Sequence, residues 1–179
     1  MVIDCIDMTD SALGASRIAA LNAACVASTQ LQFYGMSNGV TQMVSAVVNA
    51  ASAGAVDALR IWGHGGPGSQ NVSSGASGDS TDQDFAGVSV TNFGQTAGVL
   101  QQLTPLFSAS GRAELRGCSV GADGAGRALL LDLASLWNIN VYGGDVIQIG
   151  GDWSPPVTCA APSGALSTTS GPALVDGNT

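Results

Sequence analysis

The alternation of apolar segments and polar turns in the first third of the chain predicts a parallel β-sheet. Short runs rich in Val, Ile and aromatic residues read as strands at 2–7 (VIDCID), 31–36 (LQFYGM) and 56–62 (VDALRIW). Between them, residues 11–28 and 39–54 carry apolar positions at helical spacing, the first behind a cap at Thr9, Asp10 or Ser11. A strand-helix-strand-helix-strand order is typical of parallel strands joined by right-handed crossover helices.

The second half of the chain continues this alternation. We expect strands at 87–93, 112–120, 139–144 and 145–153, and helices at 96–107 and 124–137. Pro105 should kink the first of these helices or end it early. The pattern as a whole predicts an α/β fold, a three-layer α/β/α sandwich with a mainly parallel sheet of about six strands and helices on both faces.

Two segments lack a periodic pattern. Residues 63–84 are rich in Gly, Ser and Asp and read as a long exposed loop. Residues 154–179 form a Gly/Pro/Ser/Thr-rich tail for which we predict no regular structure. The expected organisation is therefore one domain over 1–153 followed by a tail over 154–179.

Composition and charge narrow the range of partners. With 179 residues, 45% of them hydrophobic, the chain can bury the core of one domain. Thirteen acidic residues against five arginines and no lysine give a formal charge of -8, which argues against nucleic acid as a partner. No segment reaches transmembrane length and the first residues do not resemble a signal peptide, so we expect no membrane partner. Because only 10% of residues are charged, a homo-oligomer is compatible with this surface.

The cysteines and acidic residues do not predict a metal site or a cofactor. Four cysteines occur without any C-x-x-C pair, at positions Cys5, Cys25, Cys118 and Cys159. Three disulfide connectivities would be open to them, and the missing export signal favours reduced thiols. Asp79, Asp82 and Asp84 lack the terminal glutamate of an EF-hand and read as a solvated acidic loop.

The residues with catalytic potential are the only histidine and one cysteine. His64 follows the strand 56–62 in the stretch GHGGPG, and Cys118 lies where RAELRGCSV runs into a turn. Ligands bind at the carboxyl ends of parallel strands, and a nucleophilic thiol needs a base to take its proton. The amides of Gly65 and Cys118 are suited to an oxyanion hole. Taken separately, each residue also fits a turn histidine or an inert packed thiol.

The two glycine-flanked turns also carry a resemblance to a known family. "GHG" paired with "RGCSVG", and the 54 positions from His64 to Cys118, resemble the caspase-like cysteine peptidases, in which this interval is about 50 residues. Residues 2–153 are more specifically similar to a caspase-like domain found near the N-termini of large bacterial surface proteins. The resemblance implies that His64 is the general acid/base, that Cys118 is the nucleophile of a peptidase acting on proteins or peptides, and that Gly65 and Cys118 form the oxyanion hole.

Arg116 takes a further role from the resemblance. In several relatives the position two residues before the nucleophile lines the pocket for the substrate's P1 side chain, so Arg116 would favour an acidic or polar P1 residue. In the alternative interpretation, Arg116 balances Glu114 or Asp123 at the rim of the sheet.

Two functions follow from the sequence. The first is a caspase-like cysteine endopeptidase that acts through a His-Cys dyad without a cofactor. The alternative is a catalytically silent caspase-like fold that serves as a structural, self-assembling or protein-interaction module, since the turn RGCSV lacks the Q-A-C signature of caspases.

Overall fold

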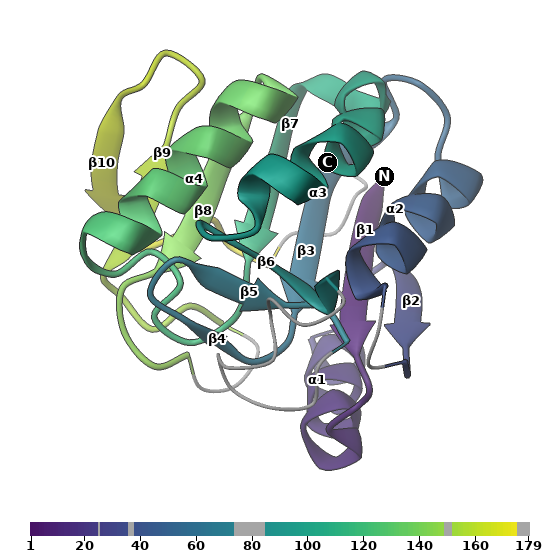
Figure 1. The fold of residues 1–179 in the computed structure, drawn as a ribbon. Coiled ribbons are helices and arrows are strands. Elements are labelled where there is room, and N and C mark those ends of the chain that lie inside the picture. Colours follow the sequence, from purple (N-terminus) through teal and green to yellow (C-terminus); the bar gives the residue numbers. More distant parts are fainter. Residues whose placement is uncertain (25, 36–37, 74–84, 149–151, 175–179) are drawn as a thin grey trace.

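The βαβαβ unit predicted for the first third of the chain is confirmed. The computed structural model describes residues 1–24, 26–35, 38–73, 85–148 and 152–174. The first five elements, shown in Figure 1, are β1 (Val2–Asp7), α1 (Ser11–Ala23), β2 (Thr29–Phe33), α2 (Gly39–Ala50) and β3 (Val56–Trp62). β1 lies between β2 and β3 and pairs with both in parallel.

The main sheet has seven strands, and most of its pairings are parallel. Its order is β10-β9-β8-β7-β3-β1-β2, with β7 at Phe107–Leu115 and β8 at Asn140–Gly144. β3, β7 and β8 continue the parallel arrangement. β9 (Val157–Ala160) and β10 (Leu166–Thr169) then add two antiparallel pairings at one edge. The structure is therefore mixed α/β with a mostly parallel sheet.

The membership of this sheet differs from the prediction of about six strands. β9 and β10 lie inside the segment 154–179, so the prediction that this segment has no regular structure is wrong there. The pairing of β9 with β8 and of β10 with β9 supplies the order that composition did not reveal. In contrast, the described residues of 145–153 form no strand, because the chain turns away from the sheet after β8.

A second, small sheet corrects the prediction of an exposed loop for residues 63–73, while 74–84 lie outside the described residues. β4 (Gly65–Gly66), β5 (Ser69–Asn71) and β6 (Gly87–Ser89) form three antiparallel strands, and most of 69–73 is buried. The strand predicted at 87–93 therefore exists only in part, as β6, and lies outside the main sheet. Figure 1 shows the small sheet near the end at which the parallel strands finish.

Alternation along the strands separates two layers of side chains. Ile3, Leu59 and Ala113 point to the larger apolar cluster, which also contains buried residues from three helical segments. These segments are α2, α3 (Phe93–Leu100) with its 3₁₀ continuation Gln101–Leu106, and α4 (Asp123–Trp137). Pro105 lies inside the 3₁₀ segment, in agreement with the predicted early end of the helix.

The opposite face of the sheet packs against α1 and holds buried charges. Leu21 of α1 meets Ile6 and Trp62 in a smaller apolar cluster. Beside this cluster, the fully buried Asp4 carboxylate accepts hydrogen bonds from Arg60 Nε at 2.7 Å, Arg60 Nη2 at 2.8 Å and Trp62 Nε1 at 2.7 Å. This ion pair lies between strands that otherwise read as apolar, and it was not predicted.

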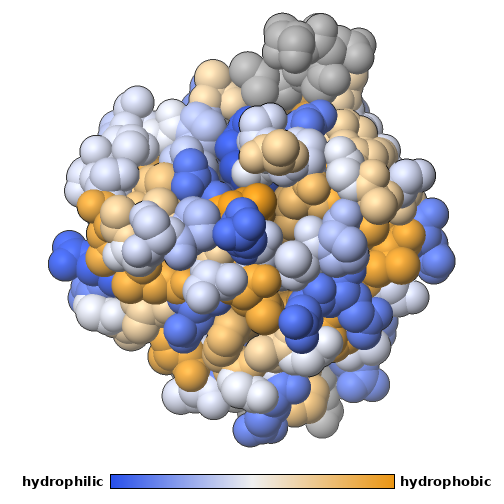
Figure 2. Space-filling view, turned by 90° about the horizontal axis from the view of Figure 1, so that it is seen from above, coloured by the Kyte–Doolittle hydropathy of each residue, from blue (hydrophilic) through white to orange (hydrophobic). Residues whose placement is uncertain are grey.

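At the end of the molecule opposite the small sheet, the described residues form no single extended apolar area. Figure 2 shows the end at which the parallel strands begin, and hydrophobic residues appear there as separate patches among hydrophilic ones. Within the described ranges, no helix has the length and apolar character needed to cross a membrane.

Candidate functional site

His64 and Cys118 lie on turns that follow neighbouring strands. β3 and β7 pair in parallel, with Ile61 opposite Leu115, so both chains leave the sheet at the same end. His64 comes two residues after β3, and Cys118 comes three residues after β7. The His64 side chain is 30% exposed and Cys118 is half-buried. Solvent therefore reaches the imidazole, and the thiol is not sealed in the core.

The two turns are in close backbone contact through glycines. A Cβ atom placed on Gly65 would lie 3.0 Å from Gly117 Cα and 2.6 Å from a methyl carbon of Val120. A Cβ atom on Gly117 would lie 2.9 Å both from Gly65 Cα and from the His64 carbonyl oxygen. These separations are too short for any side chain, so glycine at both positions lets the histidine and cysteine turns approach each other.

A buried glutamine joins the same two turns. Gln70 of β5 is fully buried, and its Oε1 accepts a hydrogen bond from the Gly117 amide at 2.8 Å. Its Nε2 donates to the Asn71 carbonyl at 2.8 Å and to the His64 carbonyl at 3.5 Å. Gln70 was not predicted as a site residue, because a polar residue in a Gly/Ser-rich stretch carries no periodic signal.

Asp10 contacts the imidazole directly. His64 Nε2 and Asp10 Oδ2 are 3.2 Å apart, and the Asp10 side chain also caps α1 by accepting from the Leu13 amide at 3.1 Å. The Leu13 hydrogen bond and then the His64 hydrogen bond lower the pKa of Asp10. Asp10 was predicted only as a candidate helix cap. Its additional contact with His64 follows from β1 and β3 being neighbours in the sheet.

The amide of Gly65 is not used in the ladder between β4 and β5. The Asn71 amide donates to the His64 carbonyl at 3.0 Å, and Gly65 is the next residue of β4, opposite Gln70. Hydrogen-bonded and non-hydrogen-bonded pairs alternate along an antiparallel ladder. The Gly65 amide therefore points away from β5 and takes no part in this ladder.

One further segment lies beside Cys118. The Ser119 amide donates to the Val146 carbonyl at 2.9 Å, and the Cys118 thiol lies 3.8 Å from the Gln148 carbonyl oxygen. Val146 and Ile147 are among the exposed large hydrophobic residues of the described chain. The segment 145–148 thus places apolar side chains on the surface near the thiol.

Arg116 already has a carboxylate partner. Its Nε donates to Glu114 Oε2 at 2.9 Å, and the guanidinium is only 2% exposed. The guanidinium carbon lies 5.0 Å from the centroid of the Trp62 ring and 4.0 Å from that of Trp153. This arrangement supports the alternative interpretation, in which Arg116 balances Glu114, and it leaves little room for an incoming P1 carboxylate.

A second buried arginine lies near the thiol. Arg17, on α1, is 6% exposed, with its guanidinium carbon 5.4 Å from the Trp62 ring centroid. Burial lowers the pKa of Arg17, and the charge that Cys118 carries as a thiolate acts in the opposite direction.

The cysteine thiols of the described chain differ in their surroundings. Cys5, Cys118 and Cys159 are free thiols, and desolvation strongly raises the pKa of the buried Cys5. Cys25 and the acidic residues at 79, 82 and 84 lie outside the described residues. Elsewhere in the described chain, no group of three or more His, Cys, Asp or Glu side chains is arranged to hold a metal ion.

Comparison with known proteins identifies a family without an assigned function. No curated protein and no solved structure matches this chain. The model of one family, described as a domain of unknown function (DUF4347), matches residues 14–163. This range includes β2 to β9 and both turns of the candidate site. The chain therefore belongs to the DUF4347 family.

Proposed function

We propose that this chain is a cysteine peptidase with a caspase-like fold, in which Cys118 is the nucleophile and His64 the general base. The observation that carries the proposal is the glycine contact between two turns at the ends of neighbouring parallel strands, one with the only histidine and the other with a half-buried thiol. The ion pair geometry of His64 with Asp10 adds a carboxylate that orients the imidazole.

The proposed reaction is acyl transfer through a thioester. His64 takes the thiol proton, and the Cys118 sulfur attacks the carbonyl carbon of a peptide bond. The amides of Gly65 and Cys118 stabilise the oxyanion, and protonated His64 delivers its proton to the leaving amine. Water, deprotonated by His64, then hydrolyses the thioester and regenerates the thiol.

In this scheme, the contact with Asp10 determines which ring nitrogen of His64 exchanges a proton with Cys118. Because the carboxylate accepts, Nε2 of His64 donates toward Asp10, and Nδ1 is left to exchange the proton with Cys118. Asp10 then also stabilises the imidazolium that forms during the reaction. The sequence did not predict this stabilisation of the imidazolium by Asp10.

The layered arrangement supports a three-layer α/β/α sandwich of the caspase-like type. α2, α3 and α4 pack in the larger cluster, and α1 packs in the smaller cluster on the other face of the sheet. The expected substrate is a protein or peptide. Arg116 is not expected to select the P1 side chain of this substrate, because Glu114 pairs with its guanidinium.

The proposal is tested by site-resolved alkylation of the thiols between pH 5 and 8. Wild type, His64→Ala and Asp10→Asn are treated with iodoacetamide, and modification of each cysteine is followed by mass spectrometry. We expect Cys118 to react fastest at mildly acidic pH and to slow in His64→Ala. A matched control is Gln32→Ala, on the edge strand β2 away from both turns.

A peptide-library cleavage assay with Cys118→Ala as the blank follows the alkylation. If Cys118 reacts like an ordinary thiol in all variants and no peptide is cleaved, the peptidase proposal is wrong. In that case the silent structural or assembly module becomes the preferred function, and size-exclusion chromatography measures whether the chain self-associates.

A further inference from the structure

A cavity at the β10 edge of the sheet is separate from the candidate peptidase site. α4 packs on β8 and β9, while β10 lies beyond β9 and all four of its residues are exposed. The sheet thus extends past its covering helix. A cavity of about 170 Å³ lies in the angle between them, lined by Arg127, Thr158, Leu166, Ser167 and Thr168.

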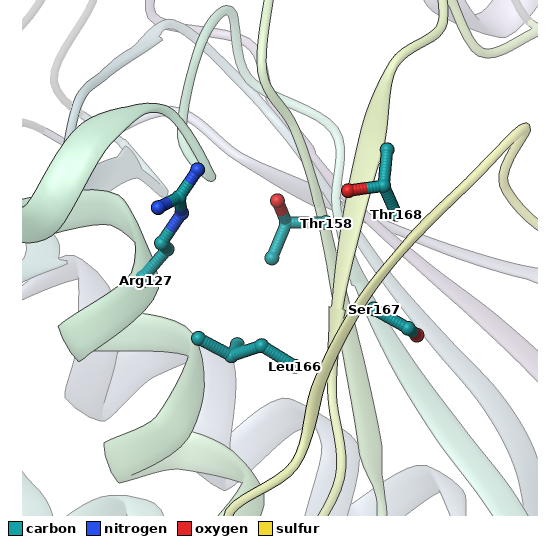
Figure 3. A pocket seen from close by; sticks show the side chains of 5 residues that line it. All are labelled: Arg127, Thr158, Leu166, Ser167 and Thr168. Carbon is teal, nitrogen blue, oxygen red and sulfur yellow. The ribbon is translucent and has the colours of Figure 1, made fainter.

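Strand alternation decides which side chains line the interior of this cavity. Thr168 pairs with Thr158 across the β9–β10 ladder, so both point to the same face of the sheet, and Leu166 shares that face two positions away. Figure 3 shows the hydroxyls of Thr158 and Thr168 on the side of the Arg127 guanidinium, and Ser167 directed away from it. The cavity therefore combines one cation, two hydroxyls and one apolar wall.

Among the residues that the structure describes, Arg127 differs from the other arginines in having no partner. Arg60, Arg112 and Arg116 form ion pairs with Asp4 or Glu114 on the opposite face. Within the described part of the chain, Arg127 is exposed and forms neither a hydrogen bond nor an ion pair. A guanidinium that lines a polar cavity without a carboxylate retains its full capacity to bind an anion.

We propose that this cavity binds a small aliphatic monocarboxylate. The planar guanidinium of Arg127 pairs with the two carboxylate oxygens, and the Thr158 and Thr168 hydroxyls donate to the same group. The Leu166 side chain covers the aliphatic part of the ligand. The cavity volume of about 170 Å³ is roughly ten times the 15 Å³ that one water requires, so a ligand of a few heavy atoms fits.

The charge of the whole chain favours a monoanion. The formal charge of -8 repels dianions such as sulfate or hydrogen phosphate more strongly than a singly charged carboxylate. The apolar contribution of Leu166 is also available only to a ligand with a hydrocarbon part. Both arguments favour a small aliphatic monocarboxylate over an inorganic anion.

The test is a methyl NMR titration of the intact chain with butyrate, butyramide and sulfate. We expect butyrate to cause saturable shifts of the Thr158, Leu166 and Thr168 methyl signals, and neutral butyramide to cause none. Arg127→Gln should weaken butyrate binding at least about tenfold, since a charge-assisted hydrogen-bonded pair is worth about 1.5 kcal/mol or more. Thr168→Val, which replaces the hydroxyl by a methyl group, should weaken binding by a smaller factor.

Ser167→Ala is the matched control, because Ser167 is on the same strand but points to the other face. Its affinity for butyrate should equal that of wild type. Equal binding of butyrate and butyramide, preferential binding of sulfate, unchanged affinity in Arg127→Gln, or the absence of methyl shifts would each overturn the proposal. None of these readouts depends on peptidase activity.

Discussion

Replacing Asp4 by asparagine should destabilise the fold more than any surface substitution. The Asp4 carboxylate accepts three hydrogen bonds from Arg60 and Trp62, and both charged side chains are fully buried. Asp4→Asn preserves the shape but leaves the Arg60 cation without its counter-charge. Breaking a buried pair in this way costs about 3–5 kcal/mol.

The charges around the pair favour the upper part of that range. Glu114 already balances Arg112 and Arg116. Without Asp4, the guanidinium groups of Arg60, Arg112 and Arg116 would therefore depend on the single Glu114 carboxylate. Arg60 Nη1 has no hydrogen-bond partner, so Asp4 provides the only side-chain hydrogen bonds of this guanidinium in the described structure.

The assay is urea unfolding followed by tryptophan fluorescence. With an m-value of about 2 kcal/mol/M, the expected loss moves the midpoint down by about 1.5–2.5 M. The double variant Asp4→Leu/Arg60→Met removes both charges and should recover most of the loss. A residual cost of about 1 kcal/mol remains, because Trp62 Nε1 loses its acceptor. A loss under about 1 kcal/mol for Asp4→Asn would refute this reasoning. So would a double variant whose loss equals the sum of the losses of Asp4→Leu and Arg60→Met measured singly.

Three further outcomes are expected from other parts of the structure. Gly98→Ala should stabilise the chain by about 0.5–1 kcal/mol, because a Cβ atom at this position meets nothing within 4 Å and alanine favours the helical conformation. Thermal unfolding measures this change, and an unchanged or lower Tm would contradict it. Because the pKa of Asp10 is lowered in the fold, its contribution is present above the usual aspartate pKa and lost as the pH falls through the lowered value. The stability difference between wild type and Asp10→Asn should thus shrink from pH 6 to pH 3, as measured by urea unfolding. Burial raises the pKa of the Cys5 thiol, so Cys5 should resist iodoacetamide at pH 8 until urea unfolds the chain, whereas Cys118 should react in the native state; equal native rates would be inconsistent with the burial of Cys5.

The strands and helices with a clear period were predictable, and those held by distant partners were not. The apolar runs that became β1, β3 and α4 have the alternation or helical spacing of their final structure. β9 depends instead on pairing with β8, and β10 on pairing with β9, and composition does not describe such pairings. Local sequence therefore indicated the parallel part of the sheet and missed its antiparallel edge.

The same division holds for the candidate site. His64 and Cys118 follow strands and were found from that position. Asp10 and Gln70 reach the site from other elements, the start of α1 and the buried strand β5. Their contributions depend on the order of strands in the sheet and on the small sheet above it, and neither was predicted.

The buried charges also bear on how the chain reaches a single strand alignment. Asp4, Arg60 and Glu114 lie directly opposite one another on β1, β3 and β7. A slip of one residue in any of these strands would turn its charged side chain into the apolar cluster that contains Leu59 and Ala113. Misaligned sheets would thus carry an unpaired charge in hydrocarbon, so these ion pairs select the correct register against its nearest competitors, independently of how much stability they add to the native state.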